Sequence, residues 1–306
     1  TLDGGTGTNT LNLSGATLDL STVKLLNFGT IGVAANQTLT LNATDLDDKT
    51  MAISLGANSI LKVIATGTPS DHDFGGITTP SKGSGASMQL ISNQSVDLSA
   101  KNLNSLFDTY SSTSGTLTLS EAQVIGKVVN GAGSAVVQVS ANSSTDFTSV
   151  LVLDTPANET ISFTGNSTFT GDFGNSNVVV NSGVTLTATS SKTSGKSISG
   201  AGNITLTDSS VSVSNINNVS AVTGVVTAVV TEQDATTLKT LLTNNSDMIT
   251  VKMAAASTAA ADLNAIDLLT GMSINATAIT ELTGNATDVK TALASSGITT
   301  VTNGSL

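Results

Sequence analysis

Three acidic residues in one short segment form the first group in the sequence that could bind a metal ion. Asp45, Asp47 and Asp48 stand close together, immediately before Lys49. Ca²⁺ takes about six to eight oxygen ligands, and spaced carboxylates of a single loop can supply several of them. A solvated acidic turn is the alternative interpretation of the same residues. The segment therefore predicts either a calcium site or an exposed turn.

An imidazole stands beside carboxylates at Asp71-His72-Asp73. A hydrolytic triad would use the histidine as general base and an aspartate to orient it, but neighbours in sequence seldom face each other. The surrounding residues 68–84 are rich in Pro, Gly and Ser, which favours a surface loop. We therefore expect His72 to be a surface residue without a catalytic role.

The composition excludes several other kinds of chemistry. All 11 basic residues are Lys and the net charge is −11, so the chain repels phosphate backbones and has no guanidinium to bind them. Cys is absent, which excludes thiol catalysis, cysteine zinc sites and disulfides. Aromatic residues make up 3% of the chain, too few for the sugar platforms that usually accompany the paired carboxylates of glycosidases. We expect a protein that is not an enzyme and does not bind nucleic acid.

Short alternating segments of Thr and aliphatic residues recur along the chain and predict strands. β-Branched Thr suits the exposed face of a pleated strand, and the aliphatic residues between suit the buried face. Gly, Asn, Ser and Asp separate these segments by about 8–12 residues, the spacing of a sandwich or a stacked β-solenoid. The expected strands include residues 10–13, 16–20, 38–41, 177–180, 184–187 and 203–207.

A second pattern, a short helix followed by a strand, repeats toward the C-terminal end. The anchors Leu238, Leu263 and Val289 lie about 25 residues apart, within the range of solenoid repeats. In two units the apolar residues share one helical face. They are Leu238, Leu241 and Leu242 in one unit and Val289, Ala292 and Leu293 in the other. Such a unit cannot bury its apolar face alone, so we expect the units to stack.

Capping pairs predict where these helices begin. They are Thr231 with Asp234, Asn285 with Asp288 and, upstream, Ser120 with Gln123. Gly271 and Gly297 stand where two helices should end.

A further apolar stripe at helical spacing comprises Leu103, Leu106, Phe107 and Tyr110. We therefore expect short helices in about residues 99–129 and 232–296.

Together these patterns predict a β-dominated fold of stacked parallel β-solenoid-like strands with short helix–strand (α/β) units, especially C-terminal. We expect a β-rich region in residues 1–97, helix–strand units in 98–145, a β-rich solenoid-like region in 146–220 and an α/β repeat in 221–306. The sequence contains no uncharged apolar run long enough for a transmembrane helix.

The N-terminal residues resemble a known family. Gly4-Gly5-Thr6-Gly7-Thr8-Asn9-Thr10-Leu11 is similar to the repeat of RTX proteins, with Asn9 where that repeat has Asp. Residues 263–267 and 282–289 likewise resemble repeats of long RTX-type and S-layer-like secreted bacterial proteins. The resemblance implies export, calcium-dependent order and a structural or adhesive role at the cell surface. It also implies Ca²⁺ ligands at Asp3 and Asn9, although these two residues make only half a site, and a plain Gly-rich turn is the alternative.

We therefore expect a non-enzymatic, extracellular structural protein of an S-layer or similar cell-surface array. It would assemble by self-association, with Ca²⁺ bridging its acidic surfaces. The main alternative is an RTX-type adhesin stalk or binding module that engages a carbohydrate, such as a cell-surface glycan, or a protein. A β-helix polysaccharide lyase is a third class, disfavoured because its substrate groove usually needs basic residues. Because the chain starts on repeat-like sequence without Met, we expect a processed or excised piece of a larger protein.

Overall fold

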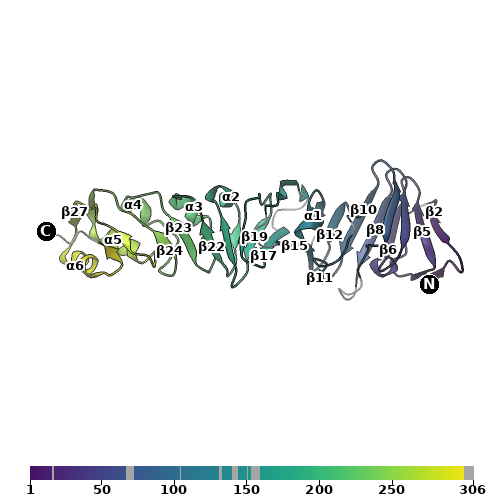
Figure 1. Ribbon diagram of the computed structural model, residues 1–306, viewed down its shortest axis with the longest axis horizontal. Helices are drawn as coiled ribbons and strands as arrows, with labels where there is room; N and C mark the ends of the chain where they lie inside the picture. The colour runs from purple at the N-terminus through teal and green to yellow at the C-terminus, as the bar shows by residue number, and fades with distance from the viewer. Residues whose placement is uncertain are drawn as a thin grey trace. The chain divides into compact units, whose positions relative to one another are not determined.

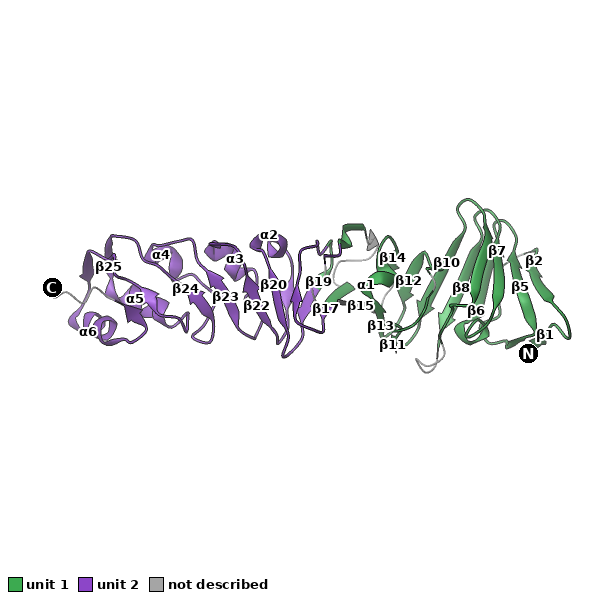
Figure 2. Cartoon of the chain, viewed as in Figure 1, with its two compact units in different colours: residues 1–139, 146–161, 174–177 green, residues 140–145, 162–173, 178–306 purple. Residues whose placement is uncertain are grey.

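A computed structural model describes residues 1–15, 17–66, 72–103, 105–130, 133–139, 144–149, 151–152 and 159–299 of the chain. Strands dominate, with 39% of residues in strands and 15% in helices, and they form several parallel sheets, as the sequence predicts (Figure 1). The chain divides into two compact units (Figure 2). Unit 1 comprises residues 1–139, 146–161 and 174–177, and unit 2 comprises residues 140–145, 162–173 and 178–306. The four segments expected from sequence remain a prediction.

Unit 1 is built from parallel sheets whose strands follow one another in chain order. One sheet is β2 (Asn9–Leu13), β5 (Phe28–Val33), β7 (Met51–Leu55) and β9 (Ile77–Lys82). A second is β3 (Leu18–Asp19), β6 (Thr38–Asn42), β8 (Ile60–Ala65), β10 (Ser87–Ser92), β12 (Thr109–Ser112), β14 (Val128–Asn130) and β16 (Leu151–Val152). The strands β11 (Val96–Asp97), β13 (Thr116–Ser120) and β15 (Ser134–Val139) are neighbours in a third, and β1 (Leu2–Asp3) pairs with β4 (Leu25–Leu26).

The strand register explains how these layers bury their apolar residues. We call the chain between a strand and its partner in the same sheet a layer. Leu39 of β6 pairs with Leu61 of β8, which pairs with Met88 of β10, and all three side chains are buried. These two layers add 22 and 27 residues, and aliphatic residues at the same position of successive layers form continuous inner rows. A single layer would therefore leave its aliphatic side chains exposed, and it needs the neighbouring layers to bury them.

The turns between the first two sheets are also stacked. Asn36, Asn58 and Gly85 follow β5, β7 and β9, and all have positive φ angles of 60°, 54° and 72°. Asn and Gly tolerate this left-handed conformation. Asn58 Nδ2 donates to Asn36 Oδ1 at 3.3 Å, and a Cβ on Gly85 would clash with Asn58 Oδ1. The turn residues therefore fix both the chain reversal and the spacing of the layers.

Unit 2 combines a parallel sheet with short helices. The sheet is β18 (Ser167–Thr168), β20 (Thr185–Ala188), β22 (Asn203–Leu206), β23 (Val226–Val229) and β24 (Met248–Thr250). The other pairs are β19 (Asn177–Val180) with β21 (Ile198–Ser199), β25 (Ser257–Ala259) with β27 (Glu281–Thr283), and β26 (Ile274–Asn275) with β28 (Ile298–Thr299). The strands β17 (Glu159–Phe163) and β19 each have residues in both units.

The helices lie between the strands along the chain. They are α1 (Glu121–Val124) in unit 1 and, in unit 2, α2 (Ser190–Thr193), α3 (Val213–Asn217), α4 (Ala235–Leu238), α5 (Ala260–Asp267) and α6 (Ala286–Ala294). Short 3₁₀ turns, η1 (Ala43–Asp45) and η2 (Phe147–Ser149), occur in unit 1. The predicted helix-then-strand order is confirmed for α4–β24, α5–β26 and α6–β28.

The predicted helix ends are confirmed in part. Ser120 and Gln123 form a capping box, and Asn285 caps α6 by accepting from the Asp288 amide. The Thr231–Asp234 prediction is wrong in register, because Asp234 itself is the N-cap of α4 and accepts from the Thr237 amide. Two helices, α2 and α3, occur where only strands were expected.

The apolar stripe from Leu103 to Tyr110 does not form a helix, contrary to prediction. Leu103, Leu106 and Phe107 are buried in an irregular segment, and Tyr110 is buried in β12. Phe107 lies between Phe74 and Tyr110, with ring centroids 5.5 and 6.1 Å away. The apolar spacing correctly predicts that these residues are buried. An irregular segment followed by a strand buries them as well as a helix would.

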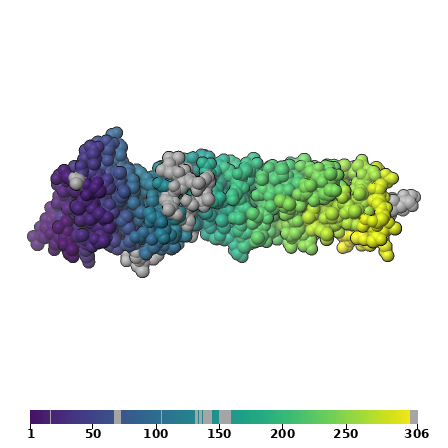
Figure 3. Space-filling view, turned by 180° about the vertical axis from the view of Figure 1, so that it is seen from behind, coloured from purple at the N-terminus to yellow at the C-terminus, as the bar shows by residue number. Residues whose placement is uncertain are grey.

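No helix in the described part of the chain combines the length and apolar character needed to cross a membrane. The N-terminal residues of unit 1 are purple in the space-filling view (Figure 3).

Candidate functional site

The Gly-rich turn at the start of the chain is held by an asparagine amide. Asn9 Nδ2 donates to the carbonyl oxygens of Gly5, Gly7 and Asn27 at 3.0–3.1 Å. These oxygens converge on one point, which is the arrangement a bound cation would require. A neutral N–H group occupies that point, so the turn is closed by the protein's own side chain.

Asp3 supports the same turn from the other side. Its Oδ1 accepts from the Gly5 amide at 2.9 Å and from Asn27 Nδ2 at 2.7 Å. These two hydrogen bonds, the backbone one first, lower the pKa of Asp3. The structure thus brings Asp3 and Asn9 together, as predicted, but both are engaged in hydrogen bonds within the turn.

The three acidic residues near Lys49 do not converge on one point. Asp45 Oδ1 accepts from the Leu25 amide at 2.9 Å, and Asp47 Oδ1 accepts from the Asp73 amide at 2.7 Å. Asp48 is exposed and has a φ of 51°, so it serves as a left-handed turn residue. Within the described ranges no three His, Cys, Asp or Glu side chains are grouped as metal ligands would be.

Asp45 differs from its neighbours because it is buried. Burial raises the pKa of its carboxyl, and the backbone amides of Leu25 and Asn42 together with Lys24 and Lys49 oppose that rise. The expectation of a solvated turn is therefore wrong for this residue.

His72 is also buried, which contradicts the expectation of a surface loop. Its ring packs toward Phe74, with the centroids 6.4 Å apart, and it joins the row formed by Phe107 and Tyr110. Asp73 Oδ1 accepts from the Gly75 amide at 2.8 Å, while Asp71 lies outside the described residues. His72 is therefore part of the core packing, and its removal should destabilise the unit.

Several acidic residues that sequence reasoning missed connect successive layers. Asp108 Oδ2 accepts from the Met88 amide at 2.7 Å, and Asp247 Oδ1 accepts from the Val226 amide at 2.7 Å. Each of these aspartates comes directly before a strand, β12 or β24, and reaches the start of the preceding strand in the same sheet. An acidic residue placed just before an alternating segment is the sequence signal that could have identified them.

Two further carboxylates of this kind cap helices in the preceding layer. Asp208 Oδ2 accepts from the amide of Ser190, the first residue of α2, at 2.6 Å. Glu232 Oε2 accepts from the amide of Val213, the first residue of α3, at 3.0 Å. Helix N-termini leave amides without intrahelical partners and favour negative charge. Part of the chain's acidic character therefore serves the contact between layers.

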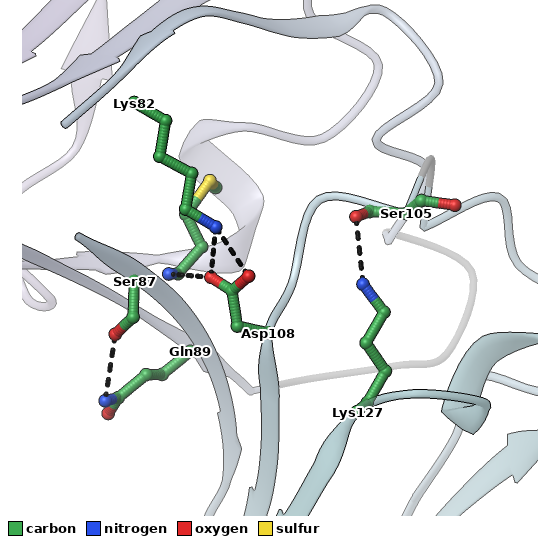
Figure 4. Close-up of polar contacts among 7 residues, drawn as sticks. Lys82, Ser87, Gln89, Ser105, Asp108 and Lys127 are labelled. Carbon is green, nitrogen blue, oxygen red and sulfur yellow. Dashed lines mark hydrogen bonds and ion pairs between the residues drawn. The ribbon is translucent and has the colours of Figure 1, made fainter. Parts of the chain in front are cut away.

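An ion pair adds to one of these contacts. Lys82 Nζ donates to both oxygens of Asp108, at 2.5 and 2.6 Å, beside the Met88 amide (Figure 4). Nearby, Lys127 Nζ donates to the Ser105 carbonyl at 3.3 Å. Both ammonium groups are used within the fold.

Among the described acidic residues of unit 1, Glu159 is the most deeply buried. It is fully buried in β17, and its oxygens have no well-formed hydrogen bond among the described residues. Burial raises the pKa of its carboxyl, and the nearby Ser176 hydroxyl opposes the rise.

Comparisons with protein-family models, curated proteins and solved structures found no match to this chain. The resemblance to RTX-type proteins therefore rests on the residues quoted for it.

Proposed function

We propose that the protein is a non-enzymatic structural component of an extracellular surface array, built as a β-solenoid that associates with further copies of itself. The parallel register supports the solenoid, because paired strands of successive layers lie 18, 22 or 27 residues apart in the sequence. The absence of Cys and the resemblance to S-layer-like proteins support an extracellular location.

The observation that carries the proposal is the parallel pairing of strands from successive layers, which add to each sheet in chain order. Among the described strands, β1, β2 and β3 each have a partner on one side only. Leu2 and Leu18, on β1 and β3, are 39% and 40% exposed. An unpaired strand edge is a template for another strand.

The last described layer of unit 2 presents a similar edge. In the described residues β27 pairs only with β25 and β28 only with β26. Leu293 of α6 is 46% exposed, and Leu282 and Val289 are partly exposed. A second copy could place this edge against the first layer of its neighbour, a heterologous contact that extends into a filament or array.

Charge substitutions on the first layer test this proposal. We expect the wild-type chain to form concentration-dependent oligomers in sedimentation velocity, and the Leu2→Lys/Leu18→Lys double variant to remain monomeric. The Ser84→Lys/Ser114→Lys variant adds the same charge at exposed turns and should assemble as the wild type does. A wild-type chain that is monomeric at all concentrations, with and without Ca²⁺, would instead favour an adhesin or passive stalk.

The Gly-rich turn at Gly5 and Gly7 allows a test of calcium binding. Asn9→Asp would replace the central N–H donor by an oxygen that faces three carbonyl oxygens, at Gly5, Gly7 and Asn27. We expect this variant to be less stable than wild type in chelator and to gain thermal stability with millimolar Ca²⁺. The wild-type turn should show no comparable gain, and NaCl at matched ionic strength controls for screening.

A further inference from the structure

Threonines form a continuous column on the outer face of the main sheet of unit 2. In this sheet β20, β22, β23 and β24 lie next to one another, and β18 pairs with β20 (Figure 2). The register places one threonine of each of the first four strands side by side, and we call these residues the threonine ladder: Thr168, Thr187, Thr205 and Thr227. The alternate residue Leu186 is buried, whereas the ladder residues are exposed or partly exposed, so the ladder faces outward.

A second row of threonines runs beside the ladder. Residues two positions further along a strand lie on the same face. At this position four of the five layers have threonine, at Thr170, Thr189, Thr207 and Thr250. The fifth residue is Val229, which pairs with Thr250. All five are exposed or partly exposed, so the face presents two adjacent rows of hydroxyl and methyl groups.

This face carries no charge, although the whole chain has a net charge of −11. The five strands contain no Asp, Glu, Lys or Arg. Among the described residues, the ladder hydroxyls make no hydrogen bond within the protein. Each hydroxyl therefore keeps one donor and two acceptor positions for a group outside the chain.

The preference of Thr for strands does not by itself explain an unbroken ladder. Thr suits the exposed face of any strand. In unit 1 an outer column of the same kind contains Thr40, Lys62 and Gln89 in register, on β6, β8 and β10. A regular parallel sheet thus tolerates mixed residues at this position. The repetition of one side chain in unit 2 points to a surface that repeats with the same spacing.

The spacing of the two rows is set by sheet geometry. Neighbouring strands lie about 4.8 Å apart, and alternate residues of a strand lie about 6.6 Å apart. Water oxygens on the prism faces of hexagonal ice form a rectangular net of similar dimensions. β-Branched threonine has few χ1 rotamers, so its hydroxyl and methyl groups are held in fixed positions on such a net.

We propose that this face of unit 2 binds the surface of ice crystals. The hydroxyls form hydrogen bonds with lattice water, and the methyl groups pack into the spaces between water molecules. A crystalline neutral polysaccharide is the other uncharged periodic surface, but sugar-binding faces usually use aromatic rings. Phe169, which stands between Thr168 and Thr170, is buried and offers none. The proposal does not depend on self-association.

The test is the partition of the whole chain into slowly growing ice, with thermal hysteresis as a second measurement. A solute without affinity for ice is pushed ahead of the growing front, and we expect the wild-type chain to be incorporated instead. Thr205→Tyr, in the interior of the ladder, should lose this incorporation, because its ring holds the lattice away from the neighbouring threonines. Thr40→Tyr, at the outer position of β6 in unit 1, is the matched control and should be incorporated as the wild type is.

A smaller change keeps the test valid if Thr205→Tyr does not fold, which circular dichroism would show. Thr187→Ser/Thr205→Ser keeps both hydroxyls but removes two methyl groups and frees the χ1 angles, so thermal hysteresis should fall. Exclusion of the wild-type chain from ice would overturn the proposal, as would incorporation that no folded ladder variant lowers. Retention on microcrystalline cellulose together with exclusion from ice would overturn it in favour of a polysaccharide surface.

Discussion

Unit 1 and unit 2 close their layers in different ways. In unit 1 most layers pass through two sheets and turn at left-handed residues such as Asn36 and Asn58. In unit 2 a layer often contains one strand of the main sheet and a short helix, as in β22–α3 and β23–α4. A strand needs a partner in the next layer for its backbone, whereas a helix satisfies most of its own hydrogen bonds.

The difference shows where each unit places its contacts between layers. In unit 1 the turns themselves stack, through the hydrogen bond from Asn58 to Asn36. In unit 2 an amide at the N-terminus of α2 and another at that of α3 donate to carboxylates of the following layer, Asp208 and Glu232. Layers that contain these short helices are therefore joined by charged hydrogen bonds instead of by stacked turns.

The largest effect is expected from a charge on the inner face of the helical layers. Leu241 is 4% exposed and Leu242, next to it, is 65% exposed. Leu241→Asp would bury an uncompensated carboxylate, and we expect the free energy of unfolding of unit 2 to fall by about 3–5 kcal/mol. Leu242→Asp should change it by less than about 0.5 kcal/mol. Urea denaturation followed by circular dichroism compares the pair, and equal losses would contradict the inward face.

A cavity in the inner row of unit 1 should have the next largest effect. Leu39→Ala removes a fully buried side chain that packs between layers, and we expect a loss of about 2–4 kcal/mol. Thr40→Ala, on the outer face of the same strand, is the control and should cost less than 1 kcal/mol. Hydrogen exchange would show whether protection falls only in unit 1. A uniform fall across both units would mean that they unfold together.

Removing an interlayer helix cap should cost less. Glu232→Gln keeps an acceptor oxygen but removes the charge at the N-terminus of α3, and we expect a loss of about 0.3–1 kcal/mol. Glu281→Gln, at an exposed position of β27, should leave stability unchanged. Melting temperatures at low and high salt would check this, because screening should shrink the difference between the two variants.

The smallest effect should be a pH dependence from Glu159. Because burial raises its pKa in the folded state, its favourable contribution is complete below the ordinary value of 4.5 and is lost as pH rises through the raised value. Asp3 and Asp234 have lowered pKa values in the folded state. Their stabilising contributions are therefore complete above the ordinary value of 3.8 and are lost as pH falls through the lowered values. Glu159→Gln should therefore flatten the fall of melting temperature above pH 4.5. An unchanged pH profile would show that this carboxyl is hydrated.

The strands were the part of the fold most open to prediction from sequence. The alternating segments at 38–41 and 177–180 became β6 and β19, with Leu39, Leu41, Val178 and Val180 buried. The Ser120–Gln123 and Asn285–Asp288 caps were equally local and were also found. The prediction of a helix from Leu103 to Tyr110 was wrong, because helical spacing indicates only that one side of a segment is buried. An irregular turn can bury one side as well.

The candidate sites depended more on distant residues. Asn9 and Asp3 could be grouped from sequence, but only the fold shows that the carbonyl of Asn27 completes the ring of acceptors around the Asn9 amide. Asp45, Asp47 and Asp48 are adjacent in sequence, yet their partners, Leu25 and Asp73, come from the layers before and after. Adjacent carboxylates therefore diverge instead of forming one site.

The sequence by itself determined which residues face inward on each strand, where several helices begin, and which chemistries the chain lacks. These properties depend on side-chain type and on periods of two to four residues, which are visible in any short segment. The tertiary structure decided which residues about 20 positions apart become neighbours, and hence the burial of His72 and the capping of α2 by Asp208. The register between layers decides which residues become neighbours, and this register is fixed by the packing of whole layers on one another.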